Sequence, residues 1–245
     1  MKRRHFIKTA SLSGIAIATI PQWAFTQNLI SVEELIGKGN PILFGDTYKL
    51  QEEAHLALLK MKKEALKENI AIQVVSSYRN FDHQKRIWER KFERYRNQGL
   101  SEENTIKKII EYSTIPGTSR HHWGTDIDIV DGNVHPPKNM LRAVHFHRDG
   151  EYIYLRRWLE KHASRFGFYL VYNDDSKRKG FKYEPWHYSY APLAIPMLKA
   201  YLNLDLNLLL VPENLEGREY ITPLFIKKYI DQNILGISSS LKPSN

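Results

Sequence analysis

Hydrophobic and polar positions along the chain follow two periodicities. From Tyr48 to Glu68, apolar side chains recur at helical spacing among charged ones, which predicts an amphipathic helix. Leu59 and Leu66 fall outside that stripe and predict a second buried face on the same helix. Similar patterns predict further helices over residues 82–98, 102–112, 152–166 and 192–201.

Short runs of β-branched and aromatic residues lie between these helices. They predict strands over residues 71–75, 125–130 and 168–172, and an extended aromatic segment over 184–190. Residues 131–150 are rich in glycine and proline and predict a long loop. The balance of short strands and helices predicts an α+β fold, with a small antiparallel sheet and flanking helices.

Residues 1–26 have the pattern of a targeting signal. A basic start contains Arg3 and Arg4, and the apolar stretch Leu12 to Ile20 is shorter than the ~20 residues of a membrane-spanning helix. The paired arginines resemble a twin-arginine export signal, and residues 24–26 offer a cleavage site. We expect export by that route to the periplasm or another extracytoplasmic space, with membrane contact only during export.

The charge and the cysteine content narrow the function. The formal net charge is +9, but residues 1–26 are basic without any acid, and the basic residues of 85–96 are interleaved with Glu89 and Glu93. Such interleaving is typical of a solvated helix face, so we expect no nucleic-acid partner. The chain has no cysteine, which excludes disulfides and thiolate metal ligands.

These patterns divide the chain into three parts. Residues 1–26 are the predicted signal peptide, and residues 27–204 form the main domain. Residues 205–245 are predicted to be a C-terminal extension with a weak apolar pattern, and its tail from Ser238 to Asn245 is predicted to be disordered. We expect the mature chain to be a monomer.

Histidine and carboxylate residues concentrate in two short windows, 119–128 and 184–187. A catalytic zinc ion takes three protein ligands, and without cysteine two imidazoles and one carboxylate are the natural set. Along a strand, Asp126 and Asp128 point to the same side. In an extended chain Glu184 and His187 face apart, so both can reach one metal ion only if the segment bends.

The two windows match the Ser-x-His-(x)6-Asp and Glu-x-Trp-His motifs of the VanY-like D-alanyl-D-alanine carboxypeptidases. The match includes Ser77-Tyr78-Arg79 followed by Gln84, and Phe166-Gly167-Phe168 with a downstream Gly180. The chain therefore resembles this family over roughly residues 48–200, in the order of the family's motifs. The wider group includes lysostaphin-type peptidases and the hedgehog signalling domain, and it implies a zinc ion in a cleft of the α+β domain.

The resemblance implies a role for each matching residue. His121, Asp128 and His187 would bind zinc. Glu184 would be the general base, and Arg79 would face the scissile carbonyl. The residues implied to surround the substrate are Ser119 and Gln84, which would hold its terminal residue, and Trp186, which would wall the site.

Some neighbouring residues have open roles. Asp126 stands where many relatives carry a small residue; it would orient His121 or His122, or be a harmless variant. His122 is expected to pack or to orient a neighbour. Ser189 stands where many relatives carry arginine. In the loop, the histidines at 145 and 147 are a weaker candidate for a second metal site.

The predicted function is a zinc-dependent carboxypeptidase that removes the terminal D-alanine from peptidoglycan stem peptides. An L,D-carboxypeptidase or an endopeptidase on peptidoglycan is an alternative on the same scaffold, because residues 85–118 and 131–150 would shape the cleft. A non-catalytic cell-wall-binding module is the alternative from another class, and such a module would have no need of Glu184.

Overall fold

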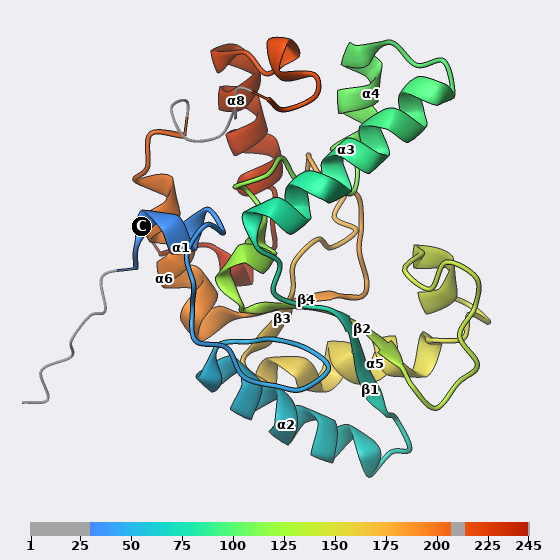
Figure 1. Ribbon diagram of the computed structural model, residues 1–245. Coiled ribbons are helices and arrows are strands. Elements are labelled where there is room, and N and C mark those ends of the chain that lie inside the picture. The colour runs from blue at the N-terminus through green and yellow to red at the C-terminus, as the bar shows by residue number, and fades with distance from the viewer. Residues whose placement is uncertain (1–29, 207–213, 245) are drawn as a thin grey trace, which may run out of the picture.

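The computed structural model describes residues 30–206 and 214–244. Within these ranges, four strands form one antiparallel sheet in the order β1-β2-β4-β3 (Figure 1). The strands are β1 (Ile72–Ser76), β2 (Asp126–Asp131), β3 (Phe168–Leu170) and β4 (His187–Tyr190). The prediction of a small antiparallel sheet with flanking helices is confirmed.

Helices lie on both sides of the sheet. Figure 1 shows α2 (Glu52–Leu66) and α5 (Ile153–His162) on one side, and α3 (Phe81–Asn97), α4 (Glu102–Ile109) and α8 (Pro223–Tyr229) on the other. The remaining α-helices of the described part are α1 (Val32–Leu35) and α6 (Ala191–Leu202). Short 3-10 turns include η1 (Arg120–Trp123), η2 (Ala143–Phe146) and η3 (Ala163–Phe166).

Two apolar clusters hold these layers together. One packs the sheet against α2 and α5, and the fully buried Ile127 and Ile129 belong to it. The other joins α1, α3, α4 and α6 to the C-terminal segment and includes Trp88. Because successive side chains of a strand point to opposite faces, the two isoleucines leave Asp126 and Asp128 on the other face of β2. Burial of the isoleucines therefore fixes the direction of both carboxylates.

The predicted helices are present, and some of their ends are shifted. The helix predicted over 48–68 is α2, and the helix predicted over 102–112 ends at Ile109. Ser101 caps α4 by accepting a hydrogen bond from the backbone N–H of Asn104. The prediction of a second buried face on α2 is wrong, since Leu59 and Leu66 are 45% and 58% exposed.

The C-terminal segment takes part in the core. Leu215, Ile226 and Leu241 are buried in the cluster that includes Trp88, and Ser239–Leu241 form a 3-10 turn. The predicted disorder of the tail is therefore wrong as far as residue 244, because Leu241 is completely buried by the core. The division of the chain at residues 204 and 205 stays a prediction.

The predicted export signal, residues 1–26, lies outside the described residues. Within residues 30–206 and 214–244, no helix has both the length and the apolar character needed to cross a membrane. The twin-arginine route therefore stays a prediction.

Candidate metal centre

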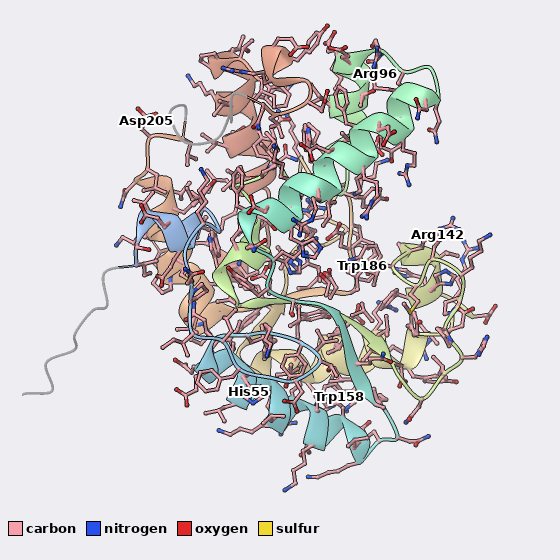
Figure 2. The ribbon with its side chains drawn as sticks, in the orientation of Figure 1. His55, Arg96, Arg142, Trp158, Trp186 and Asp205 are labelled. Atoms are coloured by element: carbon pink, nitrogen blue, oxygen red, sulfur yellow. The ribbon has the colours of Figure 1, made fainter. Side chains whose placement is uncertain are left out.

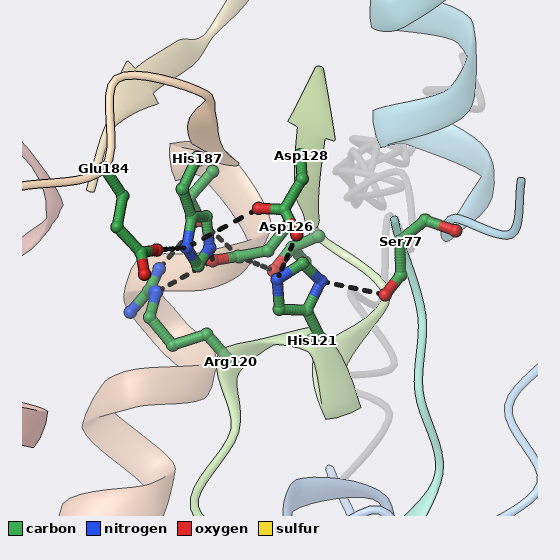
Figure 3. A network of polar contacts seen from close by, with 9 residues as sticks. Ser77, Arg120, His121, Asp126, Asp128, Glu184 and His187 are labelled. Carbon is green, nitrogen blue, oxygen red and sulfur yellow. Dashed lines mark hydrogen bonds and ion pairs between the residues drawn. The ribbon is translucent and has the colours of Figure 1, made fainter. Parts of the chain in front are cut away.

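Three buried side chains from distant parts of the chain converge on one point (Figure 3). His121 lies on η1, and Asp128 and His187 are directly opposed partners on β2 and β4. One possible ligand atom from each of the three lies within 4.8 Å of the other two. The structure thus brings together the three residues that were predicted to hold a metal ion.

A turn carries Glu184 to the same point. The backbone N–H of His187 donates to the carbonyl of Glu184 at 3.0 Å, and Pro185 lies inside this turn. The carboxylate oxygen Oε2 of Glu184 consequently lies 3.0 Å from Nδ1 of His187. The segment bends where an extended chain would have kept the two side chains apart.

Hydrogen bonding decides which ring nitrogen of His121 faces the site. Nδ1–H donates to the carbonyl of Ser77 at 2.8 Å, because a carbonyl oxygen can only accept. Nε2 therefore carries the lone pair, and it lies 3.6 Å from Oδ2 of Asp128. Burial lowers the pKa of His121, and the nearby charge of Arg79 acts in the same direction. The ring is thus neutral, as a metal ligand must be.

His187 is oriented by a second carboxylate. Its Nε2–H donates to Oδ2 of Asp126 at 2.9 Å, so Nδ1 faces Glu184 and, at 3.9 Å, Oδ1 of Asp128. Burial opposes protonation, but the hydrogen bonds to Asp126 and Glu184 and the charge of Asp128 raise the pKa of His187 to about 10. Nδ1 therefore also carries a proton, and the surrounding carboxylates of Asp126, Asp128 and Glu184 stabilise a positive charge at this point.

The donor set fits a divalent metal ion. Burial opposes ionisation of Asp128, but His121 and His187 lower its pKa to about 2, so the carboxylate is charged. Its Oδ1 is buried and accepts no hydrogen bond from the residues that the structure describes. A metal ion that replaced the Nδ1 proton would receive two imidazole nitrogens and one carboxylate oxygen, a donor set of catalytic zinc sites.

Beneath His187, the carboxylate of Asp126 is fully paired (Figure 3). Nε of Arg120 donates to Oδ2 at 3.0 Å, and the hydroxyls of Thr125 and Ser189 donate to Oδ1 at 2.8 and 2.6 Å. Nη2 of Arg120 also donates to the Ser189 hydroxyl at 2.7 Å. Burial opposes ionisation, but Arg120 and His187 hold the pKa of Asp126 well below its usual range. We call Asp126, Arg120, Thr125 and Ser189 the floor.

These contacts settle roles that the sequence left open. Asp126 orients His187, which lies on another strand, rather than a histidine of its own window. Ser189 is fully buried and bonded to Asp126, so it does not line the cavity described below. Sequence reasoning missed Arg120, whose only signal is its position inside the first window.

His122 holds the backbone of Arg79. Its Nδ1–H donates to the Arg79 carbonyl at 2.6 Å, and its Nε2 accepts from the backbone N–H of Gly117 at 3.1 Å. This pattern requires a neutral ring, and burial lowers the pKa of His122 to about 3. The Arg79 N–H in turn donates to the carbonyl of His121 at 3.1 Å. His122 thus orients a neighbour, which was one of its two expected roles.

The metal-binding cluster lies in a cavity of about 560 Å³. Its lining comes from α3, the loop after α4, η1, β2, the region of η2 and the segment before β4. Arg142 lies on the loop at the outer side, and Trp186 lies deeper, against Phe146 (Figure 2). Trp186 is 5% exposed and walls the cavity as predicted.

The other residues predicted to contact substrate differ in position. Arg79 and Ser119 line the cavity. Gln84 does not, because it is 1% exposed and its Nε2–H donates to the Thr114 carbonyl at 2.8 Å. The predicted contact between Gln84 and the substrate is therefore corrected: Gln84 positions the loop that lines the cavity.

The two loop histidines have separate partners. Nδ1 of His145 lies 2.8 Å from the carboxylate of Glu151, and Nε2 of His147 lies 3.1 Å from the hydroxyl of Tyr183. Each ring is thus engaged with a different neighbour, and the two do not join in one site.

Comparisons with known proteins identify relatives. Residues 47–193 match the family described as "VanY: D-alanyl-D-alanine carboxypeptidase". A D-alanyl-D-alanine carboxypeptidase of Enterococcus faecalis is 32% identical over 119 residues, which are 48% of this chain and 39% of that protein. One of Enterococcus faecium is 29% identical over 168 residues, 68% of this chain and 45% of that protein. The chain thus spans less than half the length of these two relatives.

Solved structures share the fold. VanYB in complex with D-alanine-D-alanine has a TM-score of 0.53 at 23% identity, and the match covers 72% of this chain and 92% of that one. A variant of the D,D-pentapeptidase VanY in complex with Zn(II) has a TM-score of 0.50 at 23% identity, with 74% and 88% covered. These likenesses establish the architecture around the site.

Proposed function

The chain belongs to the VanY family of D-alanyl-D-alanine carboxypeptidases, and on this premise we propose that it removes the terminal D-alanine from peptidoglycan stem peptides. In this proposal His121, Asp128 and His187 hold a zinc ion. One observation carries it: two imidazoles held in fixed orientation and one ionised carboxylate meet in a cavity, with Glu184 beside them.

Glu184 is placed to move a proton. Burial raises the pKa of this carboxyl group, and the hydrogen bond to His187 opposes the rise. When bound at this site, zinc lowers the pKa of a water molecule towards ~7 and polarises a carbonyl oxygen. Glu184 would accept a proton from the attacking water and deliver it to the leaving amine.

Arg79 supplies a fixed positive charge. Its Nε is buried and has no hydrogen-bond partner in the described part of the chain. Burial lowers the pKa of Arg79, and the charges of Asp128 and Glu184 oppose that change. Because His122 holds its backbone, the charge keeps its place relative to the metal ligands. Such a preorganised cation stabilises the oxyanion that develops when water attacks the carbonyl.

The same proposal places the protein outside the cytoplasmic membrane, where peptidoglycan lies. Residues 1–26 would direct export by the twin-arginine route, and the mature chain would act as a monomer. Replacement of Arg3 and Arg4 by lysine in a reporter fusion is expected to abolish export, and unchanged export would exclude that route.

Metal content and hydrolysis, measured on the same preparations, test the activity. Wild type and Glu184→Ala are each expected to bind about one zinc ion per chain. Only wild type is expected to release D-alanine efficiently from a pentapeptide ending in D-alanyl-D-alanine, with kcat/KM lowered ~100-fold or more in the variant. Glu103→Ala, which changes an exposed glutamate of α4, is the matched control and should retain both properties.

Other substrates separate the alternatives. Cleavage of a tetrapeptide stem in place of the pentapeptide would indicate an L,D-carboxypeptidase, and cleavage of cross-linked dimers would indicate an endopeptidase. Zinc binding without cleavage of any stem peptide would indicate a binding module. A chain that binds no zinc would refute the proposal.

A further inference from the structure

One wall of the cavity carries a cation without a partner. Lys91 lies on α3 and lines the cavity, and its ammonium forms neither a hydrogen bond nor an ion pair with any described residue. Lys85 on the same helix differs, because its Nζ lies 3.3 Å from the carboxylate of Glu89. The fold thus neutralises one lysine of α3 internally and leaves the other facing the cavity.

Two hydroxyl groups of the same cavity also lack partners. Oγ1 of Thr114 and Oγ of Ser119 are buried, and neither is hydrogen-bonded within the part of the chain that the structure describes. A buried hydroxyl without a partner is energetically unfavourable, so native structures retain few of them. Both hydroxyls can donate to an acceptor that enters the cavity.

The loop that bears Thr114 is attached to the same face of α3 as Lys91. Gln84 binds the carbonyl of Thr114, and Gln84 lies two helical turns before Lys91. Residues seven apart share one helix face, and helical side chains lean towards the N-terminus. The Lys91 side chain therefore extends towards the part of α3 that holds the Thr114 loop.

The surroundings of Lys91 favour an anionic ligand. Burial lowers the pKa of Lys91 to about 8, the charge of Glu184 opposes that change, and the charge of Arg79 adds to it. A partly buried ammonium next to another cation gains stability from an anion placed between them. The substrate of a carboxypeptidase always brings one such anion, the carboxylate at its C-terminus.

We propose that Lys91, together with the hydroxyls of Thr114 and Ser119, binds the C-terminal carboxylate of the substrate. This assignment rests on the proposed function, and it makes Lys91 the residue that distinguishes a chain end from an internal peptide bond. A peptide whose terminal carboxylate is converted to a carboxamide loses the charge that pairs with the ammonium and has only one oxygen left to accept from the hydroxyls. Lys91 is in this view a specificity-determining residue and takes no part in the proton transfers.

Two substrates and three enzymes test the assignment. The substrates are a pentapeptide stem as the free acid and the same stem as its C-terminal carboxamide. Wild type is expected to prefer the acid. Lys91→Met is expected to lower kcat/KM for the acid ~30-fold or more and to leave kcat/KM for the amide unchanged. Arg142→Met is the matched control, because Arg142 is the exposed cation of the cavity without a described partner, and it should keep the preference.

Several outcomes would overturn the assignment. One is a wild type that cleaves the acid and the amide equally. Another is a Lys91→Met variant that loses activity on both peptides alike while its zinc content is intact. The third is an Arg142→Met variant that alone loses the preference for the acid. Lys91→Arg keeps the charge and should keep the preference, which guards against a folding defect in the methionine variant.

The proposed function can fail separately. If wild type cleaves neither peptide, that function is refuted, and binding of D-alanyl-D-alanine measured by calorimetry then decides the role of Lys91. A Kd raised ~30-fold or more by Lys91→Met and unchanged by Arg142→Met would uphold the carboxylate site without the activity. Equal Kd values for all three proteins would overturn it.

Discussion

The charged side chains of the floor and those along the cavity wall differ in how they are paired. In the floor, Asp126 accepts hydrogen bonds from Arg120 and His187 and is fully buried. On the wall, Lys91 has no ion-pair partner among the described residues, although it lines the cavity. The carboxylate of the floor is neutralised within the protein, and the ammonium on the wall is free to pair with a ligand.

This difference separates residues that build the site from residues that recognise a ligand. A buried charge without a partner costs several kcal/mol, so the floor persists because Arg120 and His187 neutralise Asp126. On the wall the cost is smaller, since Lys91 is only partly buried and water reaches it. Substitutions in the floor should therefore affect stability and metal binding, and substitution of Lys91 on the wall should affect substrate selection.

The largest expected effect comes from breaking the floor at Arg120. Arg120→Met leaves the buried carboxylate of Asp126 with His187 as its one remaining cation among the described residues, and we expect the free energy of unfolding to fall by about 3 kcal/mol. Urea unfolding in the presence of a chelator measures this change, because chelation removes the contribution of any bound metal ion.

A double variant sharpens that test. Arg120→Met combined with Asp126→Asn removes both charges, and we expect it to recover at least half of the lost stability. Lys107→Met removes an exposed ion pair with Glu103 and should leave the unfolding midpoint unchanged. A single variant Arg120→Met as stable as this control would show that the pair does not hold the floor together.

The next effect concerns the link between the floor and the metal ligands. Asp126→Asn keeps the shape of the side chain but removes the charge that holds the Nε2 proton on His187, and zinc affinity is expected to fall ~10–100-fold. Competition with a chromophoric chelator measures the affinity. Asp131→Asn is the matched control on β2, because among the described residues its carboxylate accepts only from the backbone of Ala71 and Asn133. Equal zinc affinity of the two variants would contradict the role given to Asp126.

The sequence predicted the sheet from local patterns, and it predicted the metal ligands through the resemblance to the family's motifs. Alternation along β2 places Asp126 and Asp128 opposite the buried isoleucines, and this follows from strand geometry alone. The two windows could be joined only through the family's motifs, since the turn that brings Glu184 to His187 has no clear signal in an isolated Glu-Pro-Trp-His sequence.

Other features could not be predicted because they depend on tertiary packing. Glu89 lies four residues after Lys85, and no acid lies three or four residues from Lys91, but only tertiary packing places Lys91 at the cavity. Leu241 follows a run of serines typical of a disordered tail, and only the apolar cluster around it explains its burial. Gln84 matched a family motif that predicted a contact with the substrate, but its side-chain amide donates to the Thr114 carbonyl instead.

The smallest expected effect is a pH dependence of kcat/KM that arises from Lys91 on the wall. The pKa of Lys91 is lowered to about 8, so the ammonium is charged below that pH and loses its proton as the pH rises through it. Above that pH, kcat/KM for the free-acid pentapeptide should fall about tenfold per pH unit, because kcat/KM reports the ionisation of the free enzyme. The carboxamide should lack this dependence, and so should Lys91→Arg on the free acid, since a guanidinium stays charged. If kcat/KM fell in the same way at alkaline pH with both peptides, the ionisation would belong to a group that acts on the scissile bond. Lys91 would then line the cavity without binding the terminal carboxylate.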